Sequence, residues 1–221
     1  MQNKCVIFDM DGVLADTAPY HLQAWQIFGD KYKKHISREF FFKCFGMKNA
    51  EIFPMIFGNN AAPGSLRDLS NEKEAIFRTC IKDKVSPLPG IMSLLSDLQS
   101  NKIITAIGSS APRENVELVI EELGLNKYIK GYICSDDVKM GKPDPEIFLK
   151  TAEMCGVPAQ NCLVIEDAVV GVKAANSAGM VSVAVTNTAS AEELKDADLI
   201  IESAQEFDAE QALDLLKKSV D

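Results

Sequence analysis

The sequence lacks any apolar run that is long enough to cross a membrane. Its longest apolar stretches, such as residues 178–185, fall far short of the roughly 20 residues that a membrane helix needs. Only a four-residue apolar run precedes Asp9, whereas a secretory signal needs about 7–15 apolar residues before its cleavage site. We therefore expect a cytoplasmic protein that binds no membrane.

Positive charge and paired cysteines are also scarce. The chain has 23 Lys and Arg residues against 32 Asp and Glu residues, and the resulting net charge of −9 disfavours binding to nucleic acid. Its six cysteines form no Cys-x-x-Cys pair and it has only two histidines, so we expect reduced thiols rather than disulfides or a zinc site. The glycine-rich signatures of dinucleotide-binding and P-loop proteins are missing too.

The sequence does contain a series of short, continuously apolar runs, each of which ends in polar or glycine residues. Such runs are typical of strands that are buried on both faces of a parallel sheet. The runs are Cys5–Phe8, Ile103–Ile107, Leu163–Ile165, Val181–Val185 and Leu199–Ile201. Helical apolar spacing occurs between several of them, over Ile91–Gln99, Glu114–Leu123 and Pro145–Cys155. This alternation predicts an α/β fold with a doubly wound parallel sheet, in which ligands bind at the carboxyl ends of the strands.

Residues 16–87 interrupt the alternation of strands and helices. They contain no convincing strand, but they do contain helical patterns such as Tyr20–Phe28 and Glu72–Ile81. We therefore predict a small helical domain, residues 16–87, that is inserted into a core domain made of residues 1–15 and 88–221.

The sharpest local motif is Asp9-Met10-Asp11-Gly12, directly after the first predicted strand. Strand residues two positions apart point to the same side, so the carboxylates of Asp9 and Asp11 should act together. Gly12 allows a sharp turn because it has no Cβ. A calcium-binding loop would place its glycine later, which leaves a surface turn with two aspartates as the alternative.

A second pair of acids, Glu166-Asp167, follows another predicted strand. If both pairs meet at one edge of the sheet, like charges about 4 Å apart repel by about 4 kcal/mol at an effective dielectric constant of about 20. A bound cation would remove this repulsion, and carboxylate ligands favour Mg²⁺ over zinc or copper. We therefore predict a Mg²⁺ site at Asp9, Asp11, Glu166 and Asp167. The alternative is that these acids lie solvated on separate loops.

Two further segments carry groups that suit a phosphate. Ser109 and Ser110 follow Gly108 and offer hydroxyl and backbone N–H groups near the start of a predicted helix, although they could equally cap that helix. Lys142 lies between Gly141 and Pro143 in a loop that two prolines make rigid, although it could be an ordinary solvated lysine. We predict that Ser109, Ser110 and Lys142 bind phosphate.

The order of these motifs resembles that of the haloacid dehalogenase superfamily of phosphotransferases. The resemblance rests on Asp9-x-Asp11-Gly12, Ser109, Lys142 and Glu166-Asp167, and it covers essentially the whole chain. Two longer segments, residues 16–25 and 141–148, look like the β-phosphoglucomutase-like branch, which also contains many sugar-phosphate phosphatases. The resemblance implies a Rossmann-like core with a small helical cap formed by the inserted residues.

The resemblance also implies a role for each core residue. Asp9 would be the nucleophile that attacks phosphorus, and Asp11 would be first the general acid and then the general base. Ser109 and Lys142 would hold the transferring phosphoryl group. Asp9, the backbone carbonyl of Asp11, and Asp167 would bind Mg²⁺, with Glu166 close by or bound through water. These roles describe an enzyme that transfers phosphoryl groups through an aspartyl-phosphate.

The cap should select the substrate. His21 and Trp25 are four positions apart on one predicted helix, so they share a face that could line the mouth of the site. Trp25 could instead pack inside the cap, and His21 could simply be exposed. Lys48, Asn49 and Lys73 are further candidates for substrate contact, although we expect each of them, taken singly, to lie on a solvated face.

One departure from the branch helps to choose between two reactions. Mutases of this branch carry an arginine shortly after the cap glycine, where this chain has Gly46-Met47-Lys48-Asn49. Asn49 lacks the bidentate fork that would grip a second phosphate. We therefore expect a phosphatase that hydrolyses a small phosphorylated metabolite, such as a sugar phosphate, as a monomer or weak homo-oligomer.

Two alternatives remain. A β-phosphoglucomutase would interconvert β-glucose 1-phosphate and glucose 6-phosphate, and Lys48 or Lys73 could compensate for the missing arginine. A non-catalytic protein that binds a phosphorylated metabolite is the alternative of another class. It would not need Asp9 and Asp11 together, so the intact acids argue against it.

Overall fold

A single parallel sheet organises the core. In the computed structural model, which describes residues 3–58 and 62–218, a six-stranded sheet has the order β3-β2-β1-β4-β5-β6. Each pair of neighbouring strands is parallel. The strands are β1 (Cys5–Phe8), β2 (Ile104–Gly108), β3 (Tyr132–Ile133), β4 (Cys162–Glu166), β5 (Val181–Val185) and β6 (Leu199–Ile201). Since β1 lies between β2 and β4, the residues that follow these three strands meet at the middle of one edge of the sheet.

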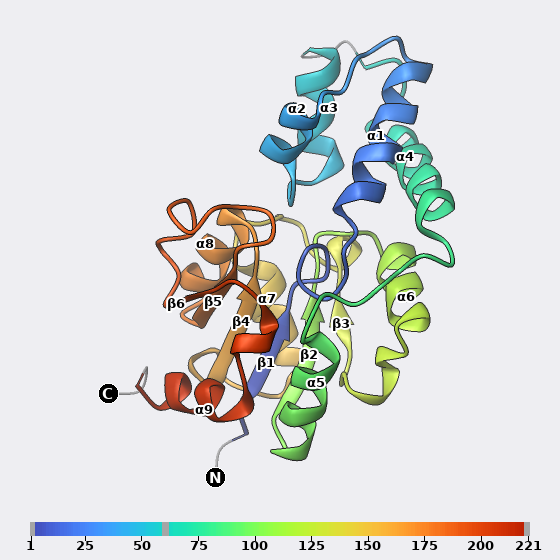
Figure 1. Cartoon of the computed structure of the whole chain (residues 1–221). Coiled ribbons are helices and arrows are strands. Elements are labelled where there is room, and N and C mark those ends of the chain that lie inside the picture. Colours follow the sequence, from blue (N-terminus) through green and yellow to red (C-terminus); the bar gives the residue numbers. More distant parts are fainter. Residues whose placement is uncertain (1–2, 59–61, 219–221) are drawn as a thin grey trace.

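Helices cover both faces of this sheet (Figure 1). One face packs against α5 (Ile91–Ser100), α6 (Arg113–Glu122) and α9 (Ala209–Lys218). The opposite face packs against α7 (Glu146–Cys155) and α8 (Val169–Ser177). Short 3₁₀ turns lie at Leu125–Lys127, Ser135–Asp137, Ala159–Asn161 and Ala204–Glu206. The predicted doubly wound α/β fold is therefore confirmed.

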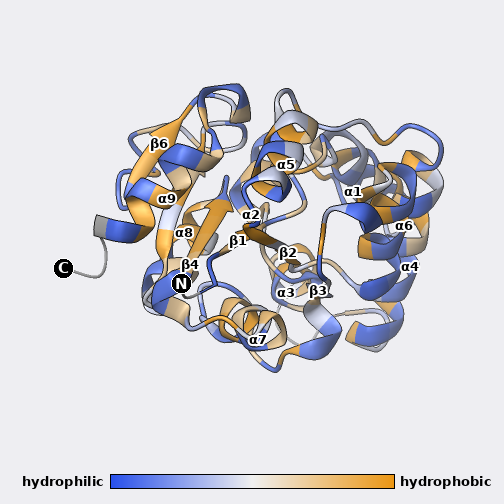
Figure 2. Cartoon of the chain, turned by 90° about the horizontal axis from the view of Figure 1, so that it is seen from below, coloured by the Kyte–Doolittle hydropathy of each residue, from blue (hydrophilic) through white to orange (hydrophobic). Residues whose placement is uncertain are grey.

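The continuous apolar runs follow from burial on both faces. Val6 and Phe8 of β1 belong to the cluster under α5 and α6, whereas Cys5 and Ile7 belong to the cluster under α7 and α8. Alternate strand residues point to opposite faces, so a strand between two helical layers needs apolar residues at every position. Figure 2 shows the hydrophobic strands surrounded by helices that carry hydrophilic segments.

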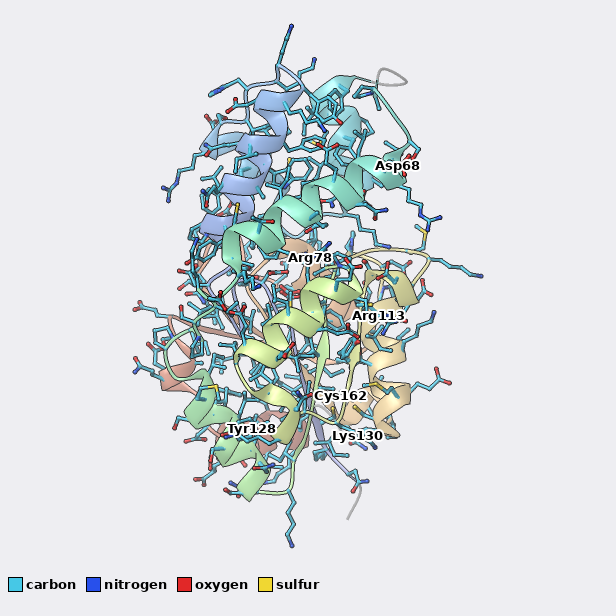
Figure 3. The ribbon with its side chains drawn as sticks, turned by 90° about the vertical axis from the view of Figure 1, so that its right-hand side faces the viewer. Asp68, Arg78, Arg113, Tyr128, Lys130 and Cys162 are labelled. Carbon is cyan, nitrogen blue, oxygen red and sulfur yellow. The ribbon has the colours of Figure 1, made fainter. Side chains whose placement is uncertain are left out.

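A second group of helices lies beyond the carboxyl ends of the strands (Figure 1). We call them the cap helices: α1 (Ala18–Lys31), α2 (Arg38–Cys44), α3 (Asn49–Phe57) and α4 (Leu66–Ile81). They pack around their own aromatic cluster, in which the rings of Trp25, Phe28 and Phe53 contact one another. The cap helix α4 lies alongside the core helix α6 (Figure 3).

Two neighbouring chain segments connect the cap helices to the core. Ala15 forms an isolated bridge with Pro87, and the backbone N–H of Leu88 donates to the carbonyl of Leu14 at 3.1 Å. The chain thus leaves the core and returns to it at the same place.

Several elements were not predicted from the sequence. The strand β3 has only two residues, both half-buried, and it lies at the edge of the sheet. The helices α2, α3, α8 and α9 were also not predicted. None of the helices in the described part of the chain has the length and apolarity that crossing a membrane would require.

Candidate active site

The acidic motifs lie at the ends of two neighbouring strands. Asp9 directly follows β1, and its backbone N–H donates to the carbonyl of Ile165 in β4 at 2.9 Å. Glu166 is the last residue of β4, and Asp167 follows it. Parallel pairing of β1 with β4 therefore brings together residues that are more than 150 positions apart in the chain.

Asp9, Glu166 and Asp167 form a compact buried cluster of carboxylates. One oxygen atom from each of them lies within 4.8 Å of the others. The ammonium of Lys142 donates to Asp9 Oδ1 at 2.5 Å, to Glu166 Oε1 at 2.6 Å and to the carbonyl of Gly108 at 3.1 Å. Lys142 is therefore a buried residue of the cluster and not an ordinary solvated lysine.

Lys142 alone does not balance this cluster, since three carboxylates share its single positive charge. Burial raises the pKa of Asp9 to about 7, and the charges of Glu166 and Asp11 add to this rise while Lys142 opposes it. Burial and the charges of Glu166 and Asp9 also raise the pKa of Asp167 well above its ordinary value. Although burial lowers the pKa of an ammonium, Asp9 and Glu166 raise that of Lys142. A divalent cation would supply the missing positive charge.

The donor atoms suit Mg²⁺, which prefers carboxylate and carbonyl oxygens. Glu166 already uses both oxygens, since Oε1 binds Lys142 and Oε2 accepts the backbone N–H groups of Asp167 at 2.9 Å and Ala168 at 3.0 Å. Among the described contacts, Asp9 and Asp167 each use only one carboxylate oxygen, with a single partner, so each has lone pairs left for a cation. Asp9 and Asp167 are therefore better placed than Glu166 to bind a metal directly.

A loop that was not predicted holds Asp167 in place. Thr188, just beyond β5, donates its hydroxyl to Asp167 Oδ2, and the neighbouring Asn187 donates its amide to the carbonyl of Gly12 at 2.8 Å. Gly12 has φ +82°, and a Cβ at this position would overlap the carboxylate of Asp167. Because threonine and asparagine are common in loops, no sequence pattern singled out this pair.

The two serines after β2 have different surroundings. Ser109 is fully buried, and its hydroxyl accepts the backbone N–H of Ala111 at 3.1 Å, which is a local turn contact. The hydroxyl of Ser110 is buried and has no hydrogen-bond partner among the described residues. An unpaired buried hydroxyl is costly, and a phosphate oxygen at this position would satisfy it.

One cavity of about 940 Å³ joins these groups to the cap helices. The predicted site residues that line it are Asp9, Asp11, His21, Trp25, Lys48, Asn49, Lys73, Ser110, Lys142, Glu166 and Asp167. Ser109 does not line it. Trp25 combines both expected positions, because it packs in the aromatic cluster of the cap and also borders the cavity.

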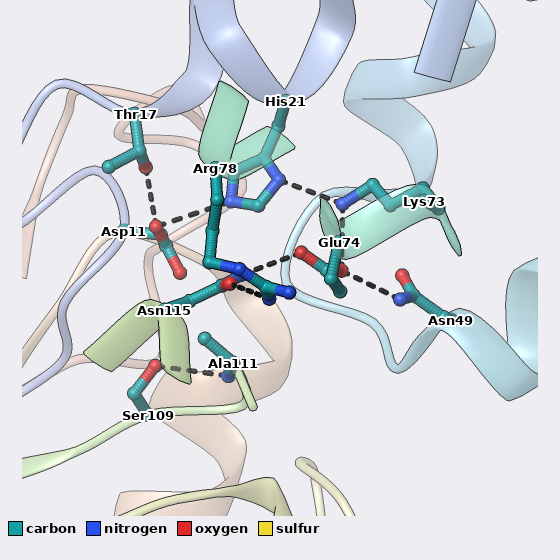
Figure 4. A network of polar contacts seen from close by, with 10 residues as sticks. All are labelled: Asp11, Thr17, His21, Asn49, Lys73, Glu74, Arg78, Ser109, Ala111 and Asn115. Carbon is teal, nitrogen blue, oxygen red and sulfur yellow. Dashed lines mark hydrogen bonds and ion pairs between the residues drawn. The ribbon is translucent and has the colours of Figure 1, made fainter. Parts of the chain in front are cut away.

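Asp11 is held by two residues of α1 and its N-terminal turn (Figure 4). Its Oδ1 accepts the hydroxyl of Thr17 at 2.6 Å and lies 3.4 Å from Nε2 of His21. Burial alone would raise the pKa of Asp11, but the hydrogen bonds from His21 and Thr17 lower it below its ordinary value. His21 is buried and stacks on Phe77 with ring centroids 3.7 Å apart, so it is not the exposed residue that we considered.

Two cap predictions concerned solvated lysines. The expectation for Lys73 was wrong: it is 2% exposed, and its Nζ lies 2.9 Å from Nδ1 of His21 and 2.9 Å from Oε1 of Glu74. The rings of Trp25 and Phe77 also flank its ammonium. Lys48 is half-buried, and its side chain packs over Gly141. Nothing in the sequence showed that the core would cover these two lysines.

Asn49 also differs from its expected solvated position. It is half-buried, and its amide donates to Oε1 of Glu74 at 2.7 Å. Asn115 of α6 contacts Glu74 as well. Neither Glu74 nor Asn115 was predicted as a site residue. Glutamate and asparagine without a motif give no signal in a single sequence.

Comparison with known proteins shows the family to which this chain is similar. The family model described as haloacid dehalogenase-like hydrolase matches residues 6–185. A phosphorylated carbohydrates phosphatase of Thermotoga maritima is 33% identical over 181 residues, which cover 80% of this chain and 82% of that protein. The β-phosphoglucomutase of Bacillus subtilis is 31% identical over 215 residues, with coverage of 94% and 92%. A crystal structure of β-phosphoglucomutase from Clostridium difficile superimposes with a TM-score of 0.89 at 33% identity, over 99% of both chains.

Proposed function

Because the chain belongs to the haloacid dehalogenase-like hydrolase family, we propose that it is a Mg²⁺-dependent phosphatase that hydrolyses a small sugar phosphate through an aspartyl-phosphate. The observation that supports this most strongly is the buried cluster of Asp9, Glu166 and Asp167 around Lys142. The unpaired hydroxyl of Ser110 in the same cavity supports a phosphate-binding position. We propose that the chain consists of two domains, a core of residues 1–15 and 88–221 and a cap of residues 16–87.

In this proposal Asp9 attacks phosphorus with the carboxylate oxygen that does not contact Lys142, its other oxygen would serve the cation, and the bond between phosphorus and the leaving oxygen breaks. Asp11 donates a proton to the leaving oxygen, which departs as an alcohol. Asp11 then takes a proton from a water molecule that attacks the aspartyl-phosphate, which releases phosphate and regenerates Asp9. The hydrogen bonds from Thr17 and His21 favour the carboxylate form of Asp11, which suits the second step.

The remaining core residues would bind the phosphoryl group and Mg²⁺ and neutralise negative charge. Lys142 and the two serines, Ser109 and Ser110, would hold the phosphoryl oxygens. Asp9, Asp167 and the backbone carbonyl of Asp11 would hold Mg²⁺, which when bound offsets the negative charge of the carboxylates and the phosphate. Glu166 would act mainly by holding Lys142 and the turn at Asp167 in place.

A β-phosphoglucomutase is the second candidate, because the similarity to solved and curated mutases extends over nearly the whole chain. Two observations favour the phosphatase. Asn49 stands where the mutases of this branch have arginine, and its amide is directed to the carboxylate of Glu74. Lys73, the buried cap lysine that contacts His21, is paired with the same carboxylate. We therefore rank the phosphatase first.

The test is a phosphate-release screen over hexose 1-phosphates, hexose 6-phosphates and an aryl phosphate, with and without Mg²⁺. We expect Mg²⁺-dependent release without a bisphosphate activator and its loss in Asp9→Asn. The exposed aspartate of α1 gives a matched control, Asp30→Asn, which should retain wild-type turnover. Conversion of β-glucose 1-phosphate to glucose 6-phosphate with little free phosphate would favour the mutase instead. Turnover by Asp9→Asn at the wild-type rate would remove Asp9 from the mechanism.

We further propose that the protein acts in the cytoplasm as a monomer or weak homo-oligomer and binds neither nucleic acid nor membranes. The net charge of −9 supports the last of these proposals, because it repels nucleic acid and anionic membrane surfaces.

A further inference from the structure

Glu74 is a buried charge of the cavity to which the proposed mechanism assigns no step. It lies on the cap helix α4, directly after Lys73, and it is 5% exposed. Its carboxylate borders the same cavity as Asp9 and Asp11. A buried carboxylate is costly unless several partners stabilise it, so its contacts indicate what it does.

The partners of Glu74 come from three elements (Figure 4). Its Oε1 accepts the amide of Asn49 at 2.7 Å and the ammonium of Lys73 at 2.9 Å, both from cap helices. Its Oε2 accepts the amide of Asn115 at 2.6 Å. Asn115 is fully buried on the core helix α6. Glu74 thus joins the cap to the core through one carboxylate.

The partners of Glu74 favour its ionised, carboxylate form. Burial opposes its ionisation, but the charge of Lys73 and the hydrogen bonds from Lys73 and Asn49 lower the pKa of Glu74 to about 2. Its negative charge is therefore a constant partner for the buried ammonium of Lys73.

Lys73 connects Glu74 to Asp11 through His21. An ammonium group has three donors and no acceptor, so Nδ1 of His21, 2.9 Å away, must be the acceptor. A neutral imidazole that accepts at Nδ1 carries its proton on Nε2, which is the atom that faces Asp11 at 3.4 Å. The carboxylate of Glu74 is thus connected to that of Asp11 through Lys73 and His21.

We propose that Glu74 is a positioning residue for the reaction: its contact with Asn115 fixes α4 against the core and thereby holds Lys73 and His21 in register with Asp11. This inference rests on the proposed phosphoryl transfer, but it concerns only the step in which the leaving oxygen receives a proton. Glu74 itself touches no reacting atom.

The leaving group provides a test that separates positioning from mere folding. An aryl phosphate with a nitro substituent releases a stable phenolate and needs little protonation, whereas a hexose phosphate releases an alkoxide and needs a well-placed acid. Since kcat/KM covers the steps up to departure of the leaving group, loss of positioning should lower it selectively for the hexose phosphate. A purely structural defect should lower it equally for both substrates.

The experiment compares kcat/KM of Glu74→Gln, Asn115→Ala and wild type on the best hexose phosphate of the screen and on p-nitrophenyl phosphate. We expect kcat/KM of both variants to fall about 10- to 100-fold on the hexose phosphate and less than about 3-fold on the aryl phosphate. The loss on the hexose phosphate is then a part of the 100-fold or more that general acid catalysis supplies. Glu74→Asp, which keeps the carboxylate, should recover part of the loss. The matched control is Glu72→Gln, since Glu72 lies on the same helix but binds Lys31 and Tyr32 away from the cavity.

Each outcome bears on the inference. Equal losses on both substrates, or no loss on either, would overturn it. If Glu74→Gln does not fold, as judged by thermal unfolding, the same substrate ratio in Asn115→Ala decides, because that variant keeps the buried pair of Lys73 and Glu74. A wild-type protein that releases no phosphate from any substrate would refute the proposed function instead.

Discussion

The carboxylates of Asp9 and Asp167 are the residues whose state depends most on a bound cation. Both are buried beside Glu166, and Lys142 supplies the only positive charge that contacts this cluster within the described residues. Like charges held this close in a low-dielectric interior repel strongly. The cluster is therefore stable with protons or with Mg²⁺ and least stable when it is ionised and metal-free.

We predict that Mg²⁺ stabilises the protein more at about pH 8 than at about pH 5.5. The pKa of Asp9 rises from an ordinary value of 3.8 to about 7 in the folded, metal-free protein. A raised folded-state pKa contributes stability that is complete below pH 3.8 and is lost as the pH rises through about 7. The pKa of Asp167 is raised as well and acts in the same direction.

The measurement is the melting temperature with and without Mg²⁺ at both pH values, because binding to the folded state alone raises it. Asp9→Asn, which removes one of the repelling charges, should raise the melting temperature of the metal-free protein at about pH 8 and reduce the gain from Mg²⁺. If Mg²⁺ raised the melting temperature by the same amount at both pH values, the predicted competition between protons and metal would be contradicted.

The sequence predicted the core of the site because strand ends have fixed positions. Asp9 and Glu166-Asp167 each follow an apolar run, and pairing of two parallel strands brings such ends together. Burial of His21 and Lys73 could not be predicted in this way, since it depends on how the cap helices lie over the core. Glu74 and Thr188 were missed for a related reason: each acts by contacting a residue that is distant in the sequence.

At the scale of elements, α8 is the helix on which the acidic turn depends. It begins at Val169, directly after the turn in which Glu166 accepts the N–H groups of Asp167 and Ala168. Gly171 lies in the first turn of this helix, and a Cβ there would overlap the carboxyl group of Glu166. The Ala- and Gly-containing sequence of α8 lacks a strong amphipathic pattern, so the spacing of apolar residues did not predict the helix.

We predict that Gly171→Ala destabilises the protein although alanine is the better helix former. Intrinsic propensity alone would favour alanine by about 1 kcal/mol. The overlap with Glu166 should outweigh this gain, since overpacking a buried site costs about 1–3 kcal/mol. Displacement of Glu166 should also weaken its contact with Lys142 and lower phosphate release.

Urea unfolding and the phosphate-release assay together test this prediction. Lys173→Ala is the matched control, because Lys173 is exposed on the same helix and its replacement should change the free energy of unfolding by less than about 0.5 kcal/mol. A Gly171→Ala protein that is more stable than wild type and fully active would show that Glu166 has room to move.

At the scale of the whole molecule, the cap helices and the core enclose a cavity between them and meet mainly beside it. The contacts include His21 with Asp11, Glu74 with Asn115 and the ion pair of Arg78 with Glu114 at 2.7 Å. Figure 3 shows Arg78 on α4 beside the core helix α6. One apolar contact adds to them, because Leu118 of α6 packs against the cluster of Phe77 and Ile81. The described structure is therefore a closed arrangement.

We predict that the free protein also populates an open arrangement in solution and that ligand shifts it to the closed one. The side chain of Glu114 is 70% exposed, and an ion pair with such a partner contributes only about 0–1 kcal/mol. A phosphate bound between the core and the cap adds contacts to both, so it favours closure and excludes water from Asp9.

Small-angle X-ray scattering of the free protein and of the protein with Mg²⁺ and vanadate, a phosphate analogue, measures this change. We expect a smaller radius of gyration in the complex, with the two antiparallel connections that meet at Ala15 and Pro87 acting as the hinge. Asp9→Asn with Mg²⁺ and a hexose phosphate should show the same decrease, since it retains the substrate without turnover. The decrease cannot come from the sheet, whose strands are buried between two helical layers, so it would have to come from movement of the cap helices. Identical scattering curves for the free and the bound protein would mean that the cap is fixed and that substrate enters the cavity without opening it.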